Sequence, residues 1–105
     1  MPKIFLKNIH CIETEDNMGA DDAYITIDDT QVWGKIKIND GQTKDIGVTH
    51  EFVHRAVIRL YDYDSDSADD FLGEMTVTAT EADGKEKDHN FTQDDANYRL
   101  NYTVY

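Results

Sequence analysis

Apolar and polar residues alternate along several segments of the chain. In "MTVTAT" (75–80) every second residue is a threonine, and in "YRLNYTVY" (98–105) apolar or aromatic residues alternate with mostly polar ones. A period of two that uses β-branched and aromatic residues is typical of half-buried β-strands. Three further segments are strand-like but less regular: 3–12, 22–28 and 32–38.

Turn-forming residues separate these segments. The clearest turns are "NDGQTKD" at 39–45 and "ADGKEKD" at 82–88. Short strands joined by turns predict an all-β fold in which antiparallel strands form a sandwich. The length of 105 residues fits one domain, which we expect to span residues 1–105.

The segment 49–60, "THEFVHRAVIRL", fits two kinds of secondary structure. Phe52, Ala56, Ile58 and Leu60 fit one face of a strand. A helix would instead gather Phe52, Val53, Ala56, Val57 and Leu60, with Thr49 as its N-cap. The pattern leaves both alternatives open.

This segment also contains the motif H-E-x-x-H, formed by His50, Glu51 and His54. In a zinc hydrolase the motif lies on a helix, where both imidazoles reach one ion and the glutamate is the general base. On a strand, four rises of about 3.3 Å would separate the histidines by roughly 13 Å, too far to share an ion. A third histidine ligand is not suggested by the sequence, so we do not favour a zinc site.

Acidic residues dominate the charge of the chain, which is −12 at pH 7. This charge argues against binding to nucleic acid and against simple electrostatic docking on anionic lipid. Of the 22 acidic residues, seven lie between Glu13 and Asp29 and six between Asp62 and Glu74. Clustered carboxylates repel one another, and a bound cation would relieve that repulsion.

The second cluster, "LYDYDSDSADDFLGE" (60–74), partly fits an EF-hand loop. Aspartates at 62, 64 and 66 match its positions 1, 3 and 5. Position 6 is Ser67 instead of glycine, and position 12 is Gly73 instead of a bidentate glutamate. The segment that follows alternates like a strand, whereas an EF-hand would continue as a helix.

A loop between two strands fits the same residues better, and here the sequence resembles a known family. "LYDYDSDSADDFLGE" is similar to the third calcium-binding loop of C2 domains, through Asp62, Asp64, Asp70 and the "FLG" that follows. "EDNMGADDAYITI" resembles their first calcium-binding loop, with Asp16 and Asp22 six residues apart and a strand beyond. The two motifs occur in the expected order.

The resemblance implies an eight-stranded antiparallel β-sandwich with its calcium loops at one end. The strand order suggests the permuted (type II) topology, in which the last strand closes the sandwich. The implied Ca²⁺ ligands are Asp16, Asp22, Asp62, Asp64 and Asp70, with Ser67 as a further one. Asp21 and Asp66 are additional carboxylates that we expect to be solvated.

The expected function is therefore that of a calcium-binding module whose loops are ordered for stability or for a protein or phospholipid partner. The alternative is a structural or protein-interaction sandwich that uses calcium only for rigidity. A Ser/His/Asp set, a phosphate-binding glycine loop and a nucleophile elbow are all missing from the sequence, so we expect no catalysis. The sequence shows neither a signal-peptide pattern nor an apolar run of membrane-spanning length, and we expect a soluble chain.

Overall fold

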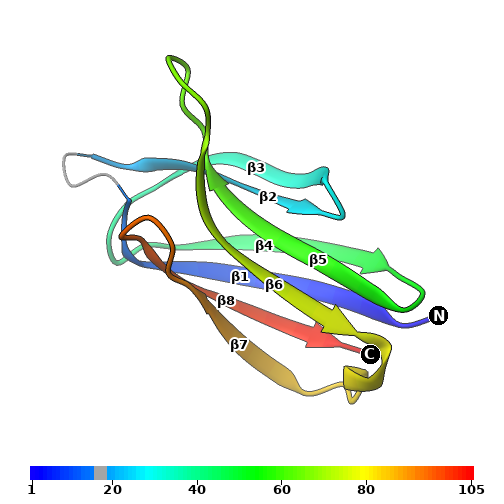
Figure 1. Cartoon of the computed structure of the whole chain (residues 1–105). Helices are drawn as coiled ribbons and strands as arrows, with labels where there is room; N and C mark the ends of the chain where they lie inside the picture. The colour runs from blue at the N-terminus through cyan, green and yellow to red at the C-terminus, as the bar shows by residue number, and fades with distance from the viewer. Residues whose placement is uncertain (16–18) are drawn as a thin grey trace.

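The computed structural model describes residues 1–15 and 19–105. Within these residues, eight β-strands form two four-stranded antiparallel sheets (Figure 1). The strands are β1 (Lys3–Glu13), β2 (Asp21–Ile27), β3 (Thr30–Ile38), β4 (Thr43–Glu51), β5 (Arg55–Asp62), β6 (Asp70–Thr78), β7 (Glu86–Phe91) and β8 (Asn97–Val104). A 3-10 turn follows β6, and no helix in the described part of the chain is long and apolar enough to cross a bilayer. The all-β sandwich expected from the alternating pattern is confirmed.

The two sheets have the strand orders β4-β1-β8-β7 and β3-β2-β5-β6. Ile9 lies opposite Leu100 in the first sheet, and Ile25 lies opposite Leu60 in the second. The last strand, β8, is inserted between β1 and β7. The permuted connectivity expected from the strand order stays a prediction.

The alternating residues of the central strands supply the core between the sheets. In β8 every second residue is buried, from Tyr98 to Val104, and the residues between them are partly or fully exposed. Full burial of a side chain such as Leu100 stabilises the fold by about 1.5–3 kcal/mol relative to leaving it in water. Apolar residues of the two inner faces therefore hold the sheets together.

The segment 49–60 is extended, and the helix that its pattern also allowed is wrong. β4 ends at Glu51 and β5 begins at Arg55. Every second residue of β5 is buried from Ala56 onward, and β5 pairs with β2 on one side and β6 on the other. Ladder hydrogen bonds on both sides require an extended backbone, and they decide between the two patterns.

Two strands begin inside segments whose sequence predicts turns. β4 begins at Thr43 and β7 at Glu86. Both lie at sheet edges; none of the residues of β4 is buried, and β7 buries only Phe91. A strand that is solvated on most of its surface lacks the apolar alternation from which a strand is predicted.

Four of the connections between strands lie at the same end of the sandwich. All paired strands are antiparallel, so strand direction alternates along the chain. The connections β1–β2, β3–β4, β5–β6 and β7–β8 therefore meet at one end, opposite the two termini (Figure 1). We call this the loop end; the β5–β6 connection projects furthest from the sheets there.

Gly73 in β6 is a position where packing excludes a side chain. Its φ is +150°, and a Cβ atom added there would lie 2.7 Å from Cβ of Phe91. Gly73→Ala is therefore expected to lower the free energy of unfolding by about 1–3 kcal/mol, the usual cost of overpacking. Urea unfolding followed by circular dichroism measures this change.

Gly19→Ala is the matched control, because a Cβ atom at Gly19 would meet no atom within 4 Å. It should change the free energy of unfolding by less than about 0.5 kcal/mol, as surface substitutions usually do. Equal effects at the two glycines would contradict the packing explanation.

Candidate metal site

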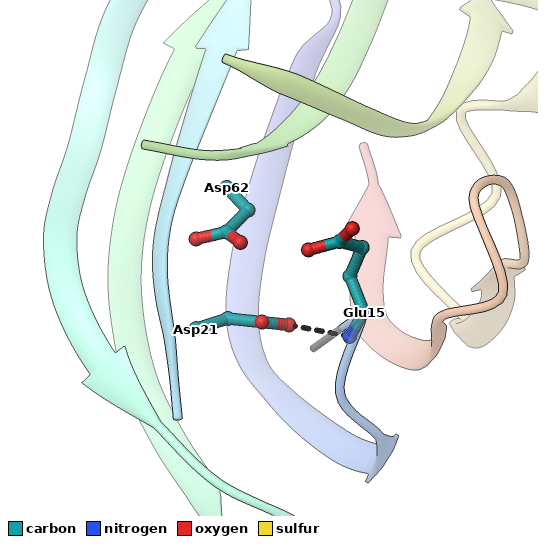
Figure 2. A group of neighbouring side chains, drawn as sticks. All are labelled: Glu15, Asp21 and Asp62. Atoms are coloured by element: carbon teal, nitrogen blue, oxygen red, sulfur yellow. Dashed lines mark hydrogen bonds between the residues drawn. The ribbon is translucent and has the colours of Figure 1, made fainter. Parts of the chain in front are cut away.

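Two acidic side chains from the two ends of the β1–β2 connection meet a third, from the end of β5, at the loop end. Glu15 follows β1, Asp21 begins β2 and Asp62 ends β5. One carboxylate oxygen of each lies within 4.8 Å of the others, and Figure 2 shows the carboxylates of Glu15 and Asp62 facing each other. Asp21 is completely buried and Asp62 is 8% exposed. We call these three residues the inner acidic group.

Hydrogen bonds hold the carboxylates of Asp21 and Asp62 in the inner acidic group. Oδ2 of Asp21 accepts a hydrogen bond of 3.0 Å from the backbone N–H of Glu15, and it accepts another from the hydroxyl of Tyr98. Oδ1 of Asp62 accepts the backbone N–H of Asp22 at 2.8 Å. Because β2 and β5 are neighbours in one sheet, Asp21 and Asp62 are positioned mainly by the sheet and its contacts.

A second cluster, the outer acidic group, shares one residue with the first. It consists of Glu15, of Asp70 at the start of β6, and of Asp94 in the β7–β8 connection. Asp70 is half-buried, whereas Asp94 is exposed and has a positive φ of 55°. Since Glu15 belongs to both groups, its carboxylate lies between two positions where a cation can be held.

Burial, together with repulsion from neighbouring carboxylates, disfavours the ionised forms of Glu15, Asp62 and Asp70. Desolvation, followed by repulsion from Asp70, raises the pKa of Glu15 to about 8. Burial raises the pKa of Asp62 to about 6, and burial and then Asp94 raise that of Asp70. Neither group contains a positively charged side chain, so protons or a cation must offset the repulsion.

Four of the predicted ligands lie in or beside these groups. Asp62 belongs to the inner group and Asp70 to the outer group. Asp22 and Asp64 line, together with Asp62 and Glu15, a cleft of about 260 Å³. Asp16 lies outside the described residues.

Asp64 and Ser67 interact with each other within the β5–β6 connection. The hydroxyl of Ser67 donates to Oδ2 of Asp64 at 2.8 Å, and the backbone N–H of Asp66 donates to Oδ1 at 2.9 Å. These hydrogen bonds lower the pKa of Asp64, so its carboxylate stays ionised. The role of both residues as ligands stays a prediction.

Three acidic residues of the two groups are absent from the predicted ligand set: Glu15, Asp21 and Asp94. The expectation that Asp21 is solvated is wrong, because its side chain is completely buried. The alternation of buried residues along β2 is the pattern that could have predicted this burial, since Asp21 shares the inward face with Ala23 and Ile25. Asp66, also expected to be solvated, is exposed.

The donors of both groups are carboxylate oxygens, without a histidine or cysteine. Such hard oxygen ligands suit Ca²⁺, Mg²⁺ or Mn²⁺ better than Zn²⁺. The H-E-x-x-H motif is not on a helix, since His50 lies in β4 and His54 in the turn that follows it. The geometry that would let two histidines four residues apart share one zinc ion is therefore missing.

Sequence comparison finds no relative for this chain: no family model and no curated protein matches it. The structure has clear matches. Human GIVD cytosolic phospholipase A2 matches with a TM-score of 0.62 and 14% identity, over 98% of this chain and 16% of the phospholipase. The chain thus spans about a sixth of that enzyme.

Smaller proteins match over the same 98% of the chain. A structure of two C2 domains of Extended-Synaptotagmin 2 matches with a TM-score of 0.61 and 20% identity, and the match covers 39% of that structure's chain. A calcium-bound structure of these domains matches with a TM-score of 0.59 and 19% identity, and the match covers 44% of its chain. A solved C2 domain is matched over 95% of its own length, with a TM-score of 0.56 and 11% identity. The sandwich described above therefore has the fold of a C2 domain.

Proposed function

We propose that this chain is a calcium-binding module in which Ca²⁺ is held at the loop end by the inner and outer acidic groups. The observation that carries the proposal is the convergence of carboxylates from three connections on Glu15. Ca²⁺ takes six to eight oxygen ligands at about 2.3–2.6 Å. Asp22 and Asp64, which line the cleft beside Glu15 and Asp62, would add further oxygen ligands to the two groups.

Calcium suits this site better than the other hard cations. Mg²⁺ requires a nearly ideal octahedron and keeps several of its water molecules, whereas Ca²⁺ accepts irregular geometries built from separate loops. The calcium-bound structure of the Extended-Synaptotagmin 2 domains, which share this fold, supports the same choice.

The module acts by binding, without catalysis, and calcium orders its loops. The ordered loops stabilise the fold or present a surface to a protein or phospholipid partner. Two calcium ions would add four positive charges to the net charge of −12, leaving −8. Phe71 and Tyr63, which are 41% and 38% exposed beside the loops, offer apolar contact area.

Calorimetric titration with calcium tests the proposal directly. We expect saturable binding and a rise in melting temperature of about 10 °C or more at a 100-fold excess over Kd, since this excess adds about 2.7 kcal/mol to stability. A lack of both heat and melting shift at millimolar calcium would refute the proposal. The double variant His50→Ala/His54→Ala should bind calcium normally, which separates this site from the zinc alternative.

Vesicle sedimentation distinguishes the two roles of calcium. Calcium-dependent sedimentation with phosphatidylcholine or phosphatidylserine vesicles would identify a phospholipid-binding module. A chain that binds calcium but stays in the supernatant with both vesicles would favour the structural or protein-interaction module. We expect the chain to stay in the supernatant with phosphatidylserine vesicles, because it remains acidic when calcium is bound.

A further inference from the structure

We infer that Tyr98 is a positioning residue for calcium: its hydroxyl holds the carboxylate of Asp21 in the orientation that binds an ion at the inner acidic group. This inference rests on the proposed function and extends it to a residue of the opposite sheet. Tyr98 belongs to β8, whereas Asp21 and Asp62 belong to β2 and β5. The affinity of the site would then depend on how the two sheets pack.

The hydrogen bonds of Asp21 support this role. Tyr98 and Asp21 are both completely buried, and the tyrosine hydroxyl donates to Oδ2 of the aspartate. The same oxygen accepts the backbone N–H of Glu15, whose side chain belongs to the same acidic group. The two donors come from different parts of the fold, and together they restrict the rotation of the Asp21 carboxylate.

Tyr98 can keep this role when an ion is bound, because a tyrosine hydroxyl donates a hydrogen bond without adding charge. A tyrosine hydroxyl has an ordinary pKa of about 10, so it keeps its proton at neutral pH. Hydrogen-bond donors that orient a metal-ligating carboxylate typically change metal affinity by 10–100-fold when they are removed. Tyr98 acts through Asp21 and is not itself a ligand of the ion.

The packing around Tyr98 allows its hydroxyl to be removed with little other change. Its ring is in the core, where Cys11 is its partner across β1 and β8 and Phe91 its partner across β7 and β8. Tyr98→Phe retains the ring and removes the hydroxyl, which interacts with the thiol of Cys11 as well as with Asp21. Tyr102→Phe is the matched control, because Tyr102 is also buried on the inward face of β8, whereas its charged neighbours, Glu81, Lys87, Asp88 and Asp83, belong to neither acidic group.

The experiment is a calorimetric calcium titration of the unmodified chain and the two variants, with the melting temperature of each metal-free protein measured alongside. We expect Tyr98→Phe to weaken one class of calcium sites by about 10-fold or more, and Tyr102→Phe to leave every calcium affinity within about twofold. A substitution that only lowers the stability of the metal-free protein would not weaken one class of calcium sites selectively.

Unchanged calcium affinity in Tyr98→Phe, with normal binding by the unmodified chain, would overturn the inference and leave the proposed function intact. Equal losses of affinity in the two variants would also overturn it. No calcium binding by the unmodified chain would instead refute the proposed function, and the inference with it.

A second measurement keeps the inference testable if Tyr98→Phe does not fold. In the unmodified chain with ¹³C at the tyrosine Cζ positions, the resonance of Tyr98 should shift with the inner-group ion, in step with the backbone amide of Glu15. The resonance of Tyr102 should stay in place. A Tyr98 resonance that does not respond to saturating calcium would overturn the inference.

Discussion

Replacing Asp62 by asparagine is expected to weaken calcium binding at the inner acidic group by at least about 100-fold, or ~2.8 kcal/mol. Asp62 is 8% exposed and lies within 4.8 Å of both Glu15 and Asp21, so its charge acts where water screens it poorly. Asparagine keeps the Oδ1 that accepts the backbone N–H of Asp22 at 2.8 Å. The local fold should therefore survive while the charged ligand is lost.

The same substitution should stabilise the metal-free chain. Burial and the nearby Asp21 raise the pKa of Asp62, which means that its ionised form is unfavourable in the folded state. Asp62→Asn should thus raise the melting temperature without calcium and remove most of the further rise that calcium causes. These opposite effects distinguish loss of a ligand from general damage to the fold.

Asp45→Asn provides a control of equal charge change. Asp45 is exposed in β4 and belongs to neither acidic group. This variant should keep the calcium affinity of the unmodified chain within about twofold. If Asp45→Asn and Asp62→Asn weakened binding equally, calcium would be responding to net charge, and the assignment of Asp62 would be wrong.

The sequence predicts those parts of the fold in which burial follows a simple period. β8 and β5 are recognisable because every second residue must be apolar to fill the space between two sheets. β4 and β7 are strands because their neighbours supply hydrogen bonds, and their mostly exposed residues carry no such pattern. Edge strands are therefore specified by tertiary pairing more than by their own sequence.

The residues of the candidate site also differ in whether a local sequence pattern or tertiary pairing brings them together. Asp62 and Asp70 are recognisable because the strands on either side fix a local pattern within one connection. Asp94 is close to Glu15 and Asp70 only because β7 and β8 bring their connection to the loop end, and β7 is a strand with little apolar alternation. Its contribution could be foreseen only after the direction of every strand was known.

Raising the pH is expected to destabilise the metal-free chain and to increase the stabilisation that calcium provides. In the folded chain the pKa of Glu15 is raised to about 8 and that of Asp62 to about 6, from ordinary values of 4.5 and 3.8. Between about pH 4 and pH 8 the folded chain thus holds protons that the unfolded chain has released. The stability from these protons is fully present below about pH 4 and is lost as pH rises to about 8.

Calcium offsets this loss of stability at high pH because it competes with the protons for the same carboxylates. Carboxylates must be ionised to bind a metal, so calcium affinity should rise over the same range of pH. We expect the metal-free melting temperature to fall by about 4 °C or more from pH 5.5 to pH 8.5, which corresponds to roughly 1 kcal/mol in a domain of this size. The further rise caused by millimolar calcium should be small at pH 5.5 and large at pH 8.5.

Differential scanning calorimetry at several pH values, with calcium or with a chelator, measures both effects. Glu15→Gln is the informative variant, because it removes the carboxyl group that both acidic groups share. It should flatten the pH dependence of the metal-free chain, whereas Asp45→Asn should retain it. A metal-free melting temperature that is constant or rises between pH 5.5 and pH 8.5 would contradict the electrostatic description of the loop end, because crowded carboxylates without a cation must become less favourable as they ionise.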